Sequence, residues 1–163
     1  MIREAVERAF TVVTANFQTD FAALATAASL VAPTADLYKR RSAERFHAHT
    51  ACGLGVYHEG GATSRRRPGA ATGSGLRDSR PVIVLDFYLR DADEADAVEL
   101  GELAIQALLR SVDEFPESPV WGAGDPRDSV TWEVIDTPLT EDRATAEFRA
   151  LVRIPVMVRE TGL

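Results

Sequence analysis

The residues best suited to metal chemistry lie in one short stretch, His47, His49, Cys52 and His58. In a strand, His47 and His49 share a face, which is how two side chains reach one metal ion. Cys52 or His58 would then add a third ligand. Zinc needs three or four such ligands in tetrahedral geometry, and this spacing fits no zinc pattern with a second ligand pair. We therefore expect no metal site, and a small metal-dependent enzyme that uses these residues is the alternative hypothesis.

The glycine-rich segment 69–75 superficially resembles a phosphate-binding loop. Such a loop needs Lys and then Ser or Thr directly after its last glycine, and here Leu76 follows Gly75. Ser74 lies between two glycines but lacks the spacing of a nucleophile elbow. We therefore interpret the segment as a flexible linker and expect no catalytic residue and no cofactor.

Two charged clusters remain. Arg65, Arg66 and Arg67 form a basic run, and we predict that they contact an acidic protein or nucleic acid, with a solvated loop tip as the other interpretation. The acidic residues gather where a long helix begins, and are Asp91, Asp93, Glu94, Asp96, Glu99 and Glu102. Carboxylates in a first helical turn stabilise the helix dipole, and no calcium-loop spacing is present. This acidic cluster therefore predicts a helix start and no cation site.

The chain has two tryptophans. Trp132 falls on the apolar face of a predicted strand, so we expect it in the core. Trp121 lies in a loop rich in Gly and Pro, where a tryptophan serves either as a packing plug or as an interface anchor. We include Trp121 among the candidate partner contacts.

Composition favours a soluble single domain. The chain has 163 residues, of which 45% are hydrophobic and 26% charged, and its net charge of −7 argues against general affinity for nucleic-acid phosphates. Cys52 is the only cysteine, so no internal disulfide forms. The opening residues lack the apolar centre of a signal peptide, and no apolar run is as long as a membrane span. We expect a protein of the cytoplasm, or of a particle assembled there, with no membrane contact.

Periodicity gives the elements of the first half. Apolar residues from Ile2 to Val13 recur at helical spacing and predict a first helix of about 15 residues. The Ala-rich stretch 17–31 predicts a second short helix or a packed connection, which Pro33 ends. Residues 46–57 predict a strand. The segment 59–80 has almost no large apolar residue, so we expect a long flexible loop on a hairpin, or an arm that becomes ordered on contact with a partner.

The second half is more strongly patterned. Residues 82–90 predict the central strand, and Asp91 with Glu94 three residues later predicts a capped helix over 92–114. A strand follows at 130–136, and 138–142 form a turn. From Thr145 to Arg159 apolar and polar residues alternate, which predicts one long half-buried strand.

That last strand is too long for its domain. About 15 residues would extend roughly 50 Å, whereas a compact domain of this size has a radius of gyration of about 15 Å. The strand must bend near Pro155 or project and contact another molecule. Its polar side carries Arg149 and Arg153, which we add to the candidate partner contacts.

Together these elements predict one α+β domain over residues 1–163. The sheet is mostly antiparallel, the central helix packs on one of its faces, and a further helix lies at the N-terminus. A domain of this class that binds a ligand on the face of its sheet is another hypothesis that the pattern leaves open.

Four stretches in this order resemble the tail terminator, or tail completion, proteins of long-tailed bacteriophages. They are IREAVERAF, GLGVYHEG with the Gly/Arg-rich loop after it, PVIVLDFYLRDADEADAVELGELAIQALLRSVDE, and VTWEVIDTPLTEDRATAEFRALVRIPVMVRE. The likeness covers roughly residues 1–16 and 50–160, and lies in the order of elements rather than in a diagnostic motif. The insert Thr19–Arg45 is longer than in the simplest members, so a related head–tail joining (neck) protein is also compatible.

The resemblance implies a structural virion protein without catalytic residues. Such proteins form a ring, commonly of six subunits, that caps the tail tube, ends tail polymerisation and joins the tail to the head connector. The partners implied are other copies of the chain, the tail tube protein and a connector or neck protein, with DNA passing through the ring unbound. Independently, a projecting strand and a loop without a core favour contacts between molecules.

Overall fold

The computed structural model describes residues 2–39, 51–66, 76–91, 93–114, 130–135, 146–156 and 158–161. Their elements are α1 (Ile2–Ala27), β1 (Asp36–Lys39), β2 (Cys52–Arg66), β3 (Leu76–Asp91), α2 (Glu94–Asp113), β4 (Thr131–Ile135), β5 (Ala146–Pro155) and β6 (Val158–Thr161). The predicted turn at 138–142 lies outside the described residues.

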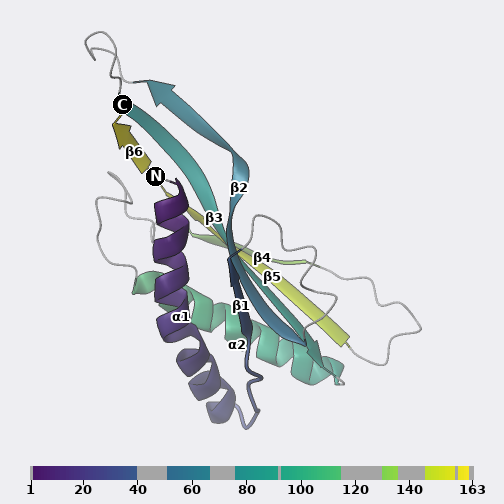
Figure 1. Ribbon diagram of the computed structural model, residues 1–163. Helices are drawn as coiled ribbons and strands as arrows, with labels where there is room; N and C mark the ends of the chain where they lie inside the picture. The colour runs from purple at the N-terminus through teal and green to yellow at the C-terminus, as the bar shows by residue number, and fades with distance from the viewer. Residues whose placement is uncertain are drawn as a thin grey trace.

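The strands form one mixed sheet in the order β1-β2-β3-β5-β4, with β6 pairing a further part of β3. Every described pairing is antiparallel except that of β1 with β2. Both helices pack on the same face of this sheet and against each other (Figure 1). The predicted α+β class, with a mostly antiparallel sheet and a helix packed on one face, is confirmed.

The N-terminal half contains one long helix where we predicted a short one and an uncertain successor. α1 continues to Ala27 because its buried positions recur every fourth residue without interruption, namely Ala5, Ala9, Val13, Phe17, Phe21 and Ala25. Its end is closed by Ser29 at φ 62°, with the Leu30 amide donating to the Ala25 carbonyl at 2.8 Å. This is a Schellman cap with serine in the position that usually holds glycine.

Aromatic rings join α1 to the central strand. Phe17 and Phe21 stack with centroids 5.4 Å apart, and both lie within about 6 Å of the Phe87 ring on β3, at 6.0 and 5.8 Å. All three side chains are almost fully buried. Burying such a ring contributes about 1.5–3 kcal/mol, so this trio is a main attachment of the helix to the sheet.

The helix α2 begins two residues later than predicted. Asp93, and not Asp91, is its N-cap, and the Asp93 carboxylate accepts from the amides of Ala95 and Asp96. Asp91 is instead the last residue of β3. Farther along, α2 touches β5 at Gly101, where a Cβ atom would lie 2.3 Å from the Phe148 ring. The glycine therefore sets how closely the helix approaches the sheet.

The segment 59–80, which we predicted to be a long loop, is largely a β-hairpin. β2 extends through Arg66, and β3 begins at Leu76. The two strands remain paired as far as Arg66↔Arg77, with an irregularity in the register between Glu59 and Thr63. The backbone ladder does not need apolar side chains, so composition concealed these strands. Residues 67–75 lie outside the described part.

The long C-terminal strand breaks at Pro155, as one of our two alternatives required. β5 ends there, the Val156 amide donates to the Pro81 carbonyl at 3.0 Å, and β6 then pairs with the far half of β3. The far halves of β2 and β3 together with β6 make a three-stranded arm, which reaches away from the helix-packed body (Figure 1). We call the strand residues 63–66, 76–80 and 158–161 the arm.

Candidate functional site

The face of the sheet opposite the helices carries charged and tyrosine side chains, which surround the apolar Val84 and Leu151. We call it the polar face, and its members in the described part of the chain include Tyr38, Tyr57, Glu59, Asp86, Tyr88, Arg90, Glu133, Glu147, Arg149 and Arg153. The face follows from the period of two, because neighbours of these residues point into the core beneath the helices. The alternation predicted for the last strand is therefore confirmed for β5.

The centre of the polar face is a buried carboxylate. Asp86 is fully buried, and Arg149 donates to both of its oxygens, from Nε at 3.1 Å and Nη2 at 2.9 Å. The Tyr57 hydroxyl donates to the Asp86 carboxylate as well, at 3.0 Å. A buried charge is tolerated only when it is paired and hydrogen-bonded, and this bidentate pair meets that condition.

A second ion cluster is centred on Arg153 of β5 and spans several strands of the sheet. Arg153 donates from Nε to Glu59 at 3.1 Å and from Nη1 to Glu133 at 2.7 Å. These partners lie on β2 and β4, so one arginine on β5 connects strands on both sides of the sheet's centre. The carboxylates are about half exposed, which limits the contribution of such pairs to less than about 1 kcal/mol each.

The third cluster joins Arg90 to Tyr88 and Glu147. Arg90 Nη2 donates to the Tyr88 hydroxyl at 3.0 Å and to the Glu147 carboxylate at 3.2 Å. Tyr88 also packs with Tyr38 and Tyr57, so tyrosine rings cover part of the polar face. In the ion pairs described for this face, arginines and carboxylates nearly neutralise one another.

The pKa values of Tyr57 and Tyr88 are both raised by their surroundings on the polar face. Burial, followed by the Asp86 carboxylate, raises the pKa of Tyr57. Burial also raises the pKa of Tyr88, against the opposing hydrogen bond from Arg90. Both hydroxyls therefore stay protonated at neutral pH and act as hydrogen-bond donors or acceptors rather than as bases. Together, the side-chain hydrogen bonds of the polar face connect β2, β3, β4 and β5 and so stiffen the sheet.

The candidate metal ligands are not brought together by the described structure. His47 and His49 lie outside the described residues, Cys52 is buried, and His58 is half-buried with Nδ1 3.3 Å from the Glu59 carbonyl. Cys52 and His58 are six residues apart on one strand, or about 20 Å, too far to share an ion. The described part of the chain holds no group of three His, Cys, Asp or Glu that could bind a metal.

Burial also affects the thiol directly. Burial, with a smaller effect from Asp36, raises the pKa of Cys52 to about 12. Metal ligation and nucleophilic attack both require the thiolate, so this environment opposes either use.

The predicted partner contacts fall into two groups. Arg149 and Arg153 lie on the polar face in the ion clusters described above. Arg65 and Arg66 belong to the strand part of the arm, and their side chains, like Arg67, Trp121 and the glycine segment 69–75, lie outside the described part of the chain.

Sequence reasoning missed the acidic partners of these arginines. Asp86 is the informative one, since a single carboxylate inside the apolar run 82–89 requires a buried cation. The strand predicted over 145–159 carries Arg149 and Arg153 on its polar side. The cation that pairs with Asp86 could therefore have been sought on that strand.

Trp132 is not in the core, contrary to our prediction. Its register opposite Val152 places it on the helix-packed side of β4, yet it is 54% exposed. β4 is the last strand of the described sheet on its side, and α2 packs mainly on β3 and β5. Periodicity predicted the correct face, but a face at the edge of a sheet is not necessarily covered.

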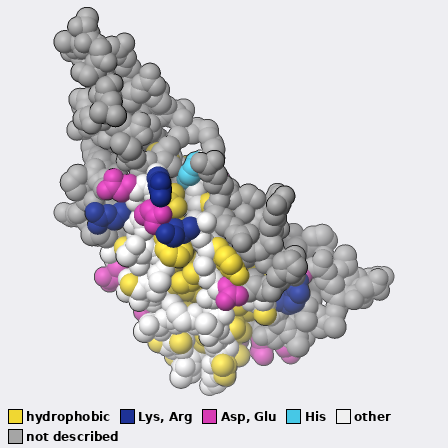
Figure 2. Space-filling view, viewed as in Figure 1, with side chains coloured by type: hydrophobic (Ala, Val, Ile, Leu, Met, Phe, Trp, Pro, Cys, Tyr) yellow, Lys and Arg dark blue, Asp and Glu magenta, His cyan; other side chains and the backbone are white. Residues whose placement is uncertain are grey.

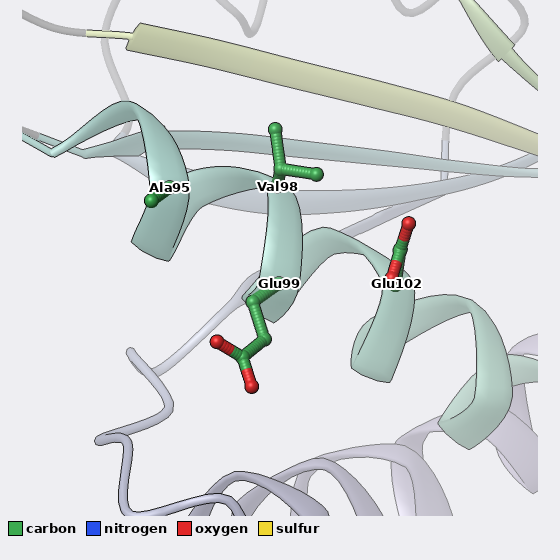
Figure 3. A pocket seen from close by; sticks show the side chains of 4 residues that line it. All are labelled: Ala95, Val98, Glu99 and Glu102. Atoms are coloured by element: carbon green, nitrogen blue, oxygen red, sulfur yellow. The ribbon is translucent and has the colours of Figure 1, made fainter.

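The helix α2 bears a shallow depression lined by Ala95, Val98, Glu99 and Glu102. Figure 3 shows Val98 and Glu102 pointing to one side of the helix and Glu99 to the other. The depression is open and its lining is mixed, so it has the character of a contact surface rather than of an enclosed substrate pocket.

Comparison with known proteins found no family model that matches the chain and no match among curated proteins. None of the helices in the described residues is long and apolar enough to cross a membrane.

Proposed function

We propose that this protein is a structural component of a phage or phage-like tail, a terminator that forms a ring on the end of the tail tube. The ring ends tail polymerisation and presents a surface to the connector or neck protein. In this proposal the chain acts through its shape and its contacts, inside the virion, and needs no cofactor.

The observation that carries the proposal is the arm. Its outer strands, β2 beyond Thr63 and β6, each pair only with β3 within the described residues. An exposed strand edge presents unpaired amides and carbonyls that recruit another chain. An arm of this kind supports a protein that works by joining to neighbours in an assembly.

The polar face offers a second support. Its arginines are largely neutralised by carboxylates, and the whole chain carries a net charge of −7. DNA adheres to surfaces with a surplus of Lys and Arg, so a balanced or acidic surface suits a passage through which DNA slides.

The proposal is tested by inactivating the gene in the phage or prophage that encodes it and measuring tails by electron microscopy. We expect tubes of uncontrolled length without attached heads, because nothing then caps the growing end. Tails of normal length that carry heads would contradict the proposal.

A further inference from the structure

Two exposed apolar side chains of the described residues lie together on one edge strand of the sheet. The large hydrophobic side chains with substantial exposure are Val31, Val98, Trp132 and Val134. Trp132 and Val134 lie on the helix-packed side of β4, opposite Val152 and Ala150, at exposures of 54% and 43%. An edge strand that exposes apolar side chains favours association, and natural proteins avoid it unless the edge is used.

We propose that this β4 edge docks on the β1 edge of a second copy of the chain, so that copies join head to tail. The inference rests on the ring proposed above and names the surfaces through which its subunits meet. β1 and β4 are the outermost strands of the described sheet, so the contact continues one sheet into the next.

The register of the sheet brings matching residues to the same level. One row runs from Lys39 through Val56, Leu85 and Val152 to Trp132, and the next runs from Leu37 through Leu54, Phe87 and Ala150 to Val134. A second copy placed beside the first without a shift therefore sets Trp132 against Lys39 and Val134 against Leu37. All four side chains belong to the helix-packed side of their sheets.

The strand directions are compatible with this contact. β1 is parallel to β2, whereas β3, β5 and β4 follow by antiparallel steps, so β1 and β4 run in opposite directions. Copies that keep the same face toward the ring axis thus meet through an antiparallel junction. That is the arrangement found in most of the sheet itself.

The two edges are also complementary in chemistry. At the β1 edge, Lys39 is exposed, pairs with Glu7 at 2.6 Å and lies 4.9 Å from the centroid of the Phe10 ring. At the β4 edge, Trp132 and Val134 form an exposed apolar pair. In the proposed contact the Lys39 cation on one edge lies against the Trp132 indole on the other, and that contact is attractive.

In the coloured part of Figure 2, Lys and Arg side chains lie beside Asp and Glu side chains, among many uncharged ones. The coloured residues in this view form no broad field of one sign.

A two-fold contact between two β4 strands is less favourable. Centring Trp132 against Val134 of the second copy places Glu133 opposite its own equivalent, and like charges directly opposite each other destabilise a strand pair. Such a contact also closes after two copies, whereas the head-to-tail contact is the type that generates rings.

The test compares Trp132→Arg with Val31→Arg by sedimentation velocity over a range of concentrations. Trp132→Arg places a cation against Lys39, and we expect self-association to weaken at least about tenfold. Val31 is the matched control, because it is 87% exposed and lies outside the proposed contact, so Val31→Arg should assemble like the wild type. Circular dichroism checks that both variants fold.

A cross-link identifies the geometry. Leu37→Cys and Val134→Cys proteins, each carrying Cys52→Ala, are mixed and oxidised with diamide. Residues opposed across a strand pair are within disulfide reach, so we expect a heterodimeric species from the mixture and none from either protein alone. A dimer from Val134→Cys alone would overturn the head-to-tail contact in favour of a two-fold one.

The two proposals fail differently. Wild-type rings that Trp132→Arg leaves intact would overturn this contact and leave the proposed function standing. A wild type that stays monomeric at every concentration would contradict the ring on which both proposals rest.

Discussion

At the scale of single residues, the buried pair Asp86–Arg149 and the more exposed pairs of Arg153 differ in what they contribute. Arg149 and Arg153 lie four residues apart on the same strand and the same face. The Asp86 side chain is 0% exposed, whereas the Glu133 and Glu59 side chains that face Arg153 are 52% and 42% exposed. Removing a cation from a buried carboxylate leaves an uncompensated charge, but removing one from exposed carboxylates leaves water to replace it.

Arg149→Met should therefore destabilise the protein by about 3 kcal/mol, and Arg153→Met by less than about 1 kcal/mol. Both substitutions keep a long side chain on the same strand, so each is the control for the other. Unfolding in guanidinium chloride measures the difference, and equal losses for the two variants would contradict the account of the polar face.

The buried thiol predicts a pH dependence. The pKa of Cys52 is raised from 9.0 to about 12, so the folded protein keeps the thiol protonated where the unfolded chain ionises. Its contribution to stability is complete below pH 9 and is lost as pH rises toward 12. Between pH 9 and 10, the wild type should lose about 1 kcal/mol more than Cys52→Ala, as measured by denaturant unfolding. A parallel pH dependence of the two proteins would show that the thiol ionises freely in the fold.

At the scale of elements, the hydrophobic pattern predicted correctly which face of a strand or helix each side chain lies on. It predicted less well whether another element buries that face. The alternation along 145–156 gave the faces of β5 correctly, and the apolar spacing of 97–112 gave the buried side of α2, because periodicity is a local property. Trp132 is exposed because α2 packs mainly on β3 and β5 and not on β4. The hydrophobic pattern of a single strand does not contain that information. The strands of the arm were missed because they are held by backbone hydrogen bonds, which composition does not reveal.

The contact between α2 and β5 gives a test at this scale. Gly101→Ala would place a methyl group 2.3–2.4 Å from the Phe148 ring, so the helix or the ring must move. We expect a loss of about 1–3 kcal/mol despite the better helix propensity of alanine. Gly101→Ala combined with Phe148→Leu should lose less than the sum of the single changes, as thermal unfolding of the set would show. Strictly additive losses would mean that the two residues do not touch.

At the scale of the whole molecule, we assign stability to the helix-packed body and contacts with neighbouring molecules to the projecting arm. Among the side chains that the structure describes, the core beneath the helices includes the aromatic trio of α1 and β3 and other residues outside 59–80. Replacing 63–80 by a short turn should therefore leave the body folded, within a few degrees of the wild-type melting temperature. The same deletion should abolish joining to the tail tube, because it removes the strands available to a neighbour. Tails of normal length assembled with the shortened protein would contradict this assignment of the arm.

The most direct test of the central claim is negative-stain electron microscopy of concentrated protein with its solution mass measured alongside. The account predicts uniform closed rings with a central opening wide enough for double-stranded DNA and a mass that is a fixed multiple of the 17.7 kDa chain. A strict monomer at every concentration, or open filaments without closure, would contradict it.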